Sequence, residues 1–191
     1  MTDPILREFP YSFDSKRLTI RGPLPGDGAQ IHTAVTETRE QLLPWMPWAV
    51  NVPSPTEYEV MMRKKQLDYL ARTDFQLLLF LRGTQTLVGT SGVHRVDWSV
   101  PKGEIGYWVR KGYERRGYIT EAVQAITALC LEKLGFVRME IRCDSRNEAS
   151  TAVARRCGYE LEATLHFDRR HHLDNGRRDT HIFYKLGEPR D

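Results

Sequence analysis

The sequence has 191 residues, with 28 lysines and arginines against 25 aspartates and glutamates, and 40% of its residues are hydrophobic. This balance is typical of a globular domain with a packed core and excludes an intrinsically disordered chain. The net charge of +3 is small, and no clustered basic face marks a nucleic-acid-binding protein, so we expect no DNA partner.

The longest purely apolar stretch covers residues 77–81, far short of the roughly 20 residues that a membrane helix needs. The first 13 residues include charged side chains and hold no continuous signal-peptide core. We therefore expect one domain, residues 1–191, in the cytoplasm and away from membranes. The three cysteines, Cys130, Cys143 and Cys157, are odd in number and lack a CxxC pair, which argues against a disulfide framework or a zinc site.

The first half of the chain predicts one strand and two helices. Residues 17–21 alternate polar and apolar side chains, as a strand does, and the apolar spacing from Ile31 predicts a helix that ends before Pro44. Ser54 and Glu57 form a capping box with a proline between them, so a second helix should begin there and run to about residue 71.

The second half predicts a hairpin, four further strands and two helices. Residues 75–81 and 86–93 are apolar and separated by a turn, so they should form the hairpin. The other expected elements are a strand at 104–109, a helix from about 120 to 134, a strand at 137–143, a helix at 147–156, and strands at 159–167 and 180–186.

The most informative segment runs from the strand at 104–109 through a basic turn directly into a helix. The free N–H groups at a helix start bind phosphate, and Gly117 would allow a phosphate group to approach the backbone closely. Arg115 and Arg116 add positive charge to the same turn. The alternative is a solvated turn with Thr120 as an ordinary cap, and a single glycine does not decide between them.

This segment resembles the acyl-CoA signature of the GCN5-related N-acetyltransferase (GNAT) superfamily, Gln/Arg-X-X-Gly-X-Gly/Ala. Gly117 matches the glycine, whereas Glu114 and Ile119 depart from the pattern. The run from Asn147 to Ser150, followed by a Gly-Tyr pair at 158–159, resembles a second family segment. Within the superfamily, the chain is similar to the RimL and RimJ branch, which acetylates the N-termini of ribosomal proteins.

The resemblance implies an α/β (α+β) fold with a central, mostly antiparallel sheet of about seven strands and four helices. The fourth and fifth strands should splay apart to admit acetyl-CoA. The residues implied in binding this co-substrate are Trp108, Val109, Arg110, Arg115, Arg116, Gly117, Tyr118, Ile119, Thr120, Asn147, Ser150 and Arg156. No metal is expected, and the acyl group transfers directly to the amine in a ternary complex.

The resemblance also implies two catalytic residues. Glu104 corresponds to the general base of the RimL-like branch, and Ser150 to the group that assists the departing thiolate. The usual acid of the superfamily, a tyrosine, is replaced here by Ala154. The alternatives are a surface Glu104 paired with Lys102, and a Ser150 that bonds only to its own backbone.

The acceptor is left open between several chemical classes. A basic segment with Arg169 and Arg170, together with Trp45 and Trp48, suggests an apolar acceptor with some negative charge, such as a ribosomal or other protein N-terminus. Antibiotics, polyamines and free amino acids are acceptors within the same branch. A longer acyl donor, a homodimer and a catalytically silent CoA-sensing or interaction module also remain open.

Overall fold

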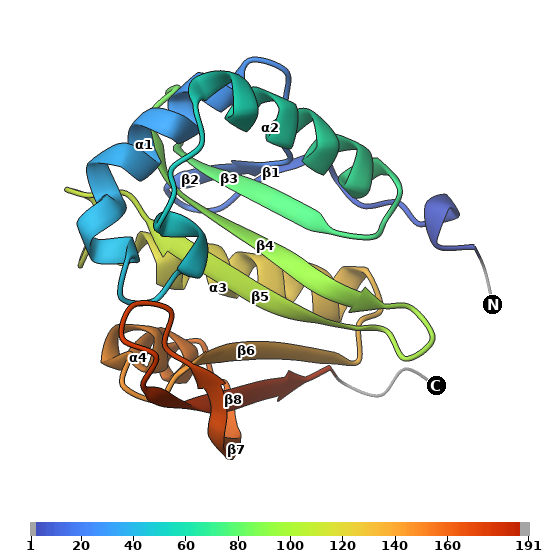
Figure 1. Ribbon diagram of the computed structural model, residues 1–191. Coiled ribbons are helices and arrows are strands. Elements are labelled where there is room, and N and C mark those ends of the chain that lie inside the picture. Colours follow the sequence, from blue (N-terminus) through green and yellow to red (C-terminus); the bar gives the residue numbers. More distant parts are fainter. Residues whose placement is uncertain (1–2, 188–191) are drawn as a thin grey trace.

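The computed structural model describes residues 3–187, and these residues build one eight-stranded sheet with helices on both faces (Figure 1). The strand order is β1-β2-β3-β4-β5-β6-β8-β7, and all neighbouring pairs are antiparallel except β5 and β6. The strands are β1 (Ser12–Asp14), β2 (Leu18–Arg21), β3 (Phe75–Leu81), β4 (Leu87–Asp97), β5 (Lys102–Val109), β6 (Arg138–Asp144), β7 (Glu160–Arg170) and β8 (Arg177–Leu186).

The four α-helices divide between the two faces of the sheet. They are α1 (Asp27–Leu42), α2 (Pro55–Leu70), α3 (Tyr118–Ala128) and α4 (Glu148–Arg156), with short 3-10 turns η1 (Pro4–Leu6) and η2 (Pro47–Ala49) and a π-helical turn η3 (Leu129–Lys133) that continues α3. The helices α1 and α2 cover one face, and α3 lies behind the sheet in the view of Figure 1. Each face therefore has its own apolar core.

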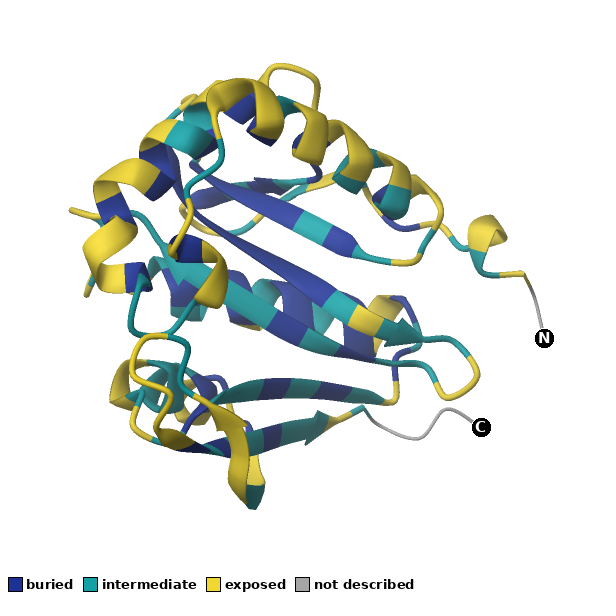
Figure 2. Cartoon of the chain, in the orientation of Figure 1, coloured by how far each residue is buried: buried dark blue, intermediate teal, exposed yellow. Residues whose placement is uncertain are grey.

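Strand β3 is buried on both faces, which explains its uninterrupted apolar sequence. Leu77 and Leu79 belong to the core under α3, whereas Leu78 and Phe80 belong to the core under α1 and α2. A strand covered on both sides does not alternate between apolar and polar residues. The central strands are accordingly among the most deeply buried parts of the chain (Figure 2).

Most of the sequence-based expectations for the elements are confirmed. Ser54 accepts a hydrogen bond from the Glu57 N–H and the Glu57 carboxylate accepts one from the Ser54 N–H, so the capping box starts α2 as predicted. Asn147 stands before α4 as its N-cap and not inside the helix. The expectation of about seven strands misses β1, a three-residue strand that pairs with β2 at the edge of the described sheet.

The last hairpin is longer than predicted. Strand β7 extends to Arg170 and β8 begins at Arg177, where the sequence suggested a long polar loop between residues 167 and 180. The outer part of β7 is exposed, so its residues carry no apolar alternation, and pairing with β8 alone makes it a strand.

The predicted splay between the fourth and fifth expected strands is confirmed at β5 and β6. These strands pair in parallel at three positions only, from Lys102 with Arg138 to Glu104 with Glu140. Beyond Glu104, β5 continues beside β4 to Val109, and β6 continues beside β8 to Asp144. The two strands therefore diverge toward their carboxyl ends, and α3 begins a short turn after the end of β5.

Candidate active site

The turn between β5 and α3 has the backbone geometry of an anion-binding loop. Arg115 and Gly117 adopt left-handed conformations, with φ of 59° and 78°, and Gly117 is the N-cap of α3. Within the described residues, no acceptor pairs with the N–H groups of residues 115–117. The first N–H groups of α3 also lack partners inside the helix, so several donors converge where the helix dipole is positive.

An open cavity of about 660 Å³ lies against this turn. Its lining is mainly cationic and polar, and consists of Lys16, Arg17, Arg115, Gly117, Thr120, Glu121, Gln124 and Arg156. Arg17 donates to Glu121 at 2.6 Å and to the carbonyl of Arg116 at 2.9 Å, and its guanidinium stacks over the Tyr118 ring. Lys16 and Arg17 line this cavity although no sequence motif marks them, because they lie about 100 residues away from the turn.

Two residues expected to bind the co-substrate point elsewhere. The Arg110 guanidinium pairs with Glu37 of α1 at 2.7 Å, and the backbone N–H of Arg110 donates to the Val88 carbonyl. Ile119 is buried in the core under α3, so its side chain does not crowd the turn and only its backbone remains for binding. Glu114, the other departure from the signature, accepts a hydrogen bond from the Gly112 N–H.

Ser150 of α4 meets Tyr107 of β5 across the splay. The Ser150 hydroxyl lies 2.9 Å from the Tyr107 hydroxyl, which also donates to the Ser150 carbonyl at 3.2 Å. The Asn147 side chain accepts from the Ser150 N–H and fixes this first turn of α4. Burial raises the pKa of Tyr107 well above its usual range, so the phenol keeps its proton at neutral pH. Sequence spacing gave no sign of this contact.

A second cavity, of about 450 Å³, lies between the sheet and helices α1 and α2. Apolar side chains form most of its lining, namely Ile31, Val35, Met46, Trp48, Pro53, Tyr58, Met61, Met62 and Trp108, and Gln76, Thr90, Ser91, His94, Gly106 and Tyr107 complete it. Trp48 is 43% exposed at the cavity, and its ring centroid lies 6.4 Å from that of Trp108. Trp45 is half-buried and does not line this cavity.

Glu104 lies on the same side of the sheet as this cavity but does not line it. Its carboxylate is 3.2 Å from the Arg95 guanidinium, whereas Lys102, the partner considered from the sequence, lies 3.7 Å from Asp97. Pairing with Lys102 is therefore wrong. One carboxylate oxygen of Glu104 is buried without a well-formed hydrogen bond.

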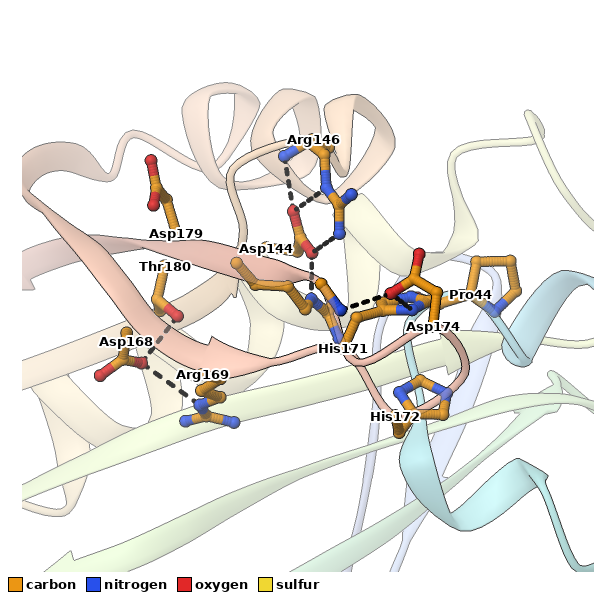
Figure 3. A network of polar contacts seen from close by, with 12 residues as sticks. Pro44, Asp144, Arg146, Asp168, Arg169, His171, His172, Asp174, Asp179 and Thr180 are labelled. Atoms are coloured by element: carbon orange, nitrogen blue, oxygen red, sulfur yellow. Dashed lines mark hydrogen bonds and ion pairs between the residues drawn. The ribbon is translucent and has the colours of Figure 1, made fainter.

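The hairpin of β7 and β8 contacts the loop after α1. His171 donates through Nε2 to the Pro44 carbonyl at 3.2 Å, and His172 to the Leu43 carbonyl at 2.7 Å. Two of the hairpin's arginines are paired with carboxylates: Arg169 with Asp168 of the same hairpin (Figure 3), and Arg178 with buried Asp144 of β6. This pairing weakens the argument for an acidic acceptor. Arg170 donates to the Asn175 carbonyl.

The cysteines are poor candidates for a covalent intermediate. Burial raises the pKa of Cys130 and Cys143 above the ordinary thiol value and that of Cys157 to about 11, so each is protonated at neutral pH. Across residues 3–187, no three His, Cys, Asp or Glu side chains gather as metal ligands would. None of the described helices is long and apolar enough to cross a membrane.

Comparisons with known proteins agree on one family. Residues 17–160 match the family model described as "Acetyltransferase (GNAT) domain". The Bacillus subtilis (strain 168) protein named "Putative ribosomal N-acetyltransferase YdaF" is 29% identical over 146 residues, which cover 76% of this chain and 79% of that protein.

The fold is shared with solved structures, among them those of two acetyltransferases. The ribosomal L7/L12 α-N-protein acetyltransferase RimL in complex with coenzyme A superposes with a TM-score of 0.84 at 20% identity, covering 91% of this chain and 96% of that one. The microcin C7 self-immunity acetyltransferase MccE, in complex with acetyl-CoA and AMP, also gives 0.84, at 19% identity and 93% and 97% coverage.

Proposed function

This chain belongs to the GNAT acetyltransferase family and is an acyltransferase, and we propose that it moves an acetyl group from acetyl-CoA to the α-amino group of a protein or peptide N-terminus. The observation that carries the proposal is the arrangement around β5. A cationic turn with free N–H groups follows the strand, and an apolar cavity lies beside it. A donor bound at the turn and an acceptor held in the cavity would meet at this strand.

The proposed donor site begins at the turn. The N–H groups of residues 115–120, with Arg17, Arg115 and Arg156, would hold the pyrophosphate, because charge-assisted hydrogen bonds to phosphate are the strong ones. The pantetheine arm would enter the splay between β5 and β6. There, Ser150, hydrogen-bonded to Tyr107, would donate to the thiolate as it leaves.

The proposed acceptor site is the cavity under α1 and α2. Its lining favours an amine attached to an apolar group, with Trp48 and Trp108 providing aromatic contacts. An N-terminal α-amino group has a pKa of about 7.7–8.0, so a substantial fraction of these groups is in the reactive, neutral form at physiological pH. Strand N–H groups near Val109 would stabilise the oxyanion as the amine attacks the thioester.

A small-molecule amine is the second candidate. The volume of the cavity, about 450 Å³, falls within the range of pockets that enclose small ligands. A polyamine or aminoglycoside fits less well, since the lining contains no carboxylate to pair with several positive charges.

The test is a thiol-release assay with acetyl-CoA and a panel of acceptors: N-terminal peptides that begin with apolar, polar or acidic residues, ribosomal proteins, free amino acids, polyamines and aminoglycosides. We expect peptides with an apolar first residue to be turned over best. Preferred turnover of a non-peptide amine would assign the small-molecule function. Tight CoA binding with no turnover on the whole panel would contradict the proposal and support a CoA-sensing module.

A further inference from the structure

A histidine and an aspartate form an oriented pair at the apolar cavity. His94 lies on β4 and lines the cavity, and its Nδ1 is 2.8 Å from Oδ2 of Asp74. Lys65 of α2 contacts the other carboxylate oxygen of Asp74 at 3.1 Å. We propose that His94 accepts the proton of the acceptor amine and that Asp74 is its positioning residue; this inference rests on the proposed function.

The hydrogen bond to Asp74 fixes which nitrogen of His94 is free. Although burial raises the pKa of Asp74, the hydrogen bonds and charges of His94 and Lys65 outweigh it and bring the pKa below its usual value. An ionised carboxylate only accepts hydrogen bonds, so Nδ1 of His94 must donate. In the neutral ring, Nε2 is then the unprotonated nitrogen, and no described residue forms a hydrogen bond with it.

Two glycines leave the space that the imidazole ring of His94 occupies. Gly92 of β4 and Gly106 of β5 are register partners. A Cβ atom at Gly92 would lie 2.8 Å from Nε2 of His94, and one at Gly106 would lie 3.2 Å from Cδ2. The ring therefore occupies the space above these two glycines, which the Cβ atom of any larger residue would enter.

Glu104 is the other candidate for the proton acceptor, and its surroundings differ. It is the register partner of His94, so both side chains lie on the same face of the sheet. The Arg95 guanidinium lies 3.2 Å from the Glu104 carboxylate, so this carboxylate already has a cationic partner, whereas no described residue bonds to Nε2 of His94. An imidazole titrates near 6.5 and a carboxylate near 4.3 in model compounds, so the imidazole is better matched to neutral pH.

The proposed step conserves protons and electrons. Nε2 of His94 takes one proton from the ammonium form of the acceptor, and the nitrogen lone pair forms the C–N bond. The C–S bond breaks, and its electron pair goes to sulfur. The second proton leaves nitrogen and ends on the thiolate, which yields the amide and the free thiol of CoA. His94 then returns its proton to water.

The test compares kcat/KM as a function of pH for four proteins: the unaltered chain, His94→Gln, Glu104→Gln and Asp74→Asn. His166→Gln is the matched control, because His166 also pairs with an aspartate, Asp179 at 2.9 Å, but is 73% exposed on the hairpin. Circular dichroism and CoA calorimetry first establish that each variant is folded and binds the donor.

For His94→Gln we expect a loss of roughly 10² to 10⁴ in kcat/KM near pH 7. The loss should shrink as the pH rises past about 8, where the amine is already neutral. In Asp74→Asn the acid limb of the profile should move to lower pH, because the imidazolium loses its carboxylate partner. His166→Gln should match the unaltered chain.

An unchanged acid limb in His94→Gln, or its loss in Glu104→Gln alone, would overturn the inference. If His94→Gln does not fold, an Asp74→Asn profile identical to that of the unaltered chain overturns it instead. These outcomes differ from a failure of the proposed function, in which the unaltered chain itself would bind CoA and acetylate no amine.

Discussion

At the scale of single residues, Gly117 matters both for its backbone conformation and for its position beside the proposed donor site. Its φ of 78° is unfavourable for any residue with a side chain, and a Cβ atom there would point toward Arg17, 3.4 Å away. A side chain would thus stand in the cationic cavity while straining the turn that presents the N–H groups.

Replacement of Gly117 by valine should weaken CoA binding at least tenfold, measured by calorimetry. Gly83→Val is the control, since Gly83 has a similar φ of 74° in an open turn between β3 and β4. It should cost similar stability and leave CoA affinity unchanged. Equal CoA affinity in a folded Gly117→Val protein would show that the donor binds elsewhere.

The contact between Ser150 and Tyr107 predicts coupled effects on turnover. Because a hydrogen bond to a charged group contributes about 1.5–3 kcal/mol, Ser150→Ala and Tyr107→Phe should each lower kcat by roughly 10- to 100-fold. The double variant should lose less than the product of the two. Thr151→Val, one residue further along α4, should change kcat little. Strictly multiplicative losses would mean that the two hydroxyls act independently.

At the scale of elements, a buried carboxylate anchors the last hairpin to the sheet. Asp144, at the end of β6, has a side chain only 2% exposed and pairs with Arg178 of β8 and with Arg146. Burial raises the pKa of Asp144, but the two guanidiniums outweigh it and bring the pKa to about 2. This ion pair therefore attaches the β7–β8 hairpin to β6, the strand that forms one side of the splay.

This pairing predicts a pH dependence of stability. The folded state holds the carboxyl pKa below its unfolded value of about 3.9, so the ion pair contributes its full stability above pH 4. About 2 kcal/mol should be lost as the pH falls from 4 to 2. Asp144→Asn should lower the free energy of unfolding at pH 7 by at least as much, since Arg178 is left buried and unpaired.

Urea unfolding followed from pH 2 to pH 7 measures both effects. Asp174→Asn, which removes an exposed carboxylate on the same hairpin, is the control and should change stability less. A pH dependence in Asp144→Asn as steep as that of the unaltered chain would contradict this account.

At the scale of the whole molecule, local sequence patterns predicted the elements, and long-range pairing supplied the rest. The capping box at Ser54 and the apolar run of β3 are local signals, and both were read correctly. The cationic turn was found because its residues are consecutive. The sequence did not predict roles for Arg17, His94 and Tyr107. Their partners come from other strands and helices, and the spacing of residues in a single sequence does not encode those contacts.

The protonated cysteines and the two adjoining sites predict direct transfer with no acyl-enzyme. Initial-rate plots at varied acetyl-CoA and acceptor concentrations should give intersecting lines, and Cys143→Ser should keep most of the activity. Parallel lines, together with acetyl label retained on the protein when acceptor is omitted, would indicate a covalent intermediate instead.

The three paired positions between β5 and β6 also affect how the chain unfolds. Strands β1 to β5 and strands β6 to β8 form two blocks, and past Glu104 no β5–β6 ladder bonds join them. A pantetheine arm with two amides of its own would act as a short surrogate strand between the blocks. Binding would then raise the cooperativity of unfolding as well as the midpoint, because the blocks would melt together and not one after the other.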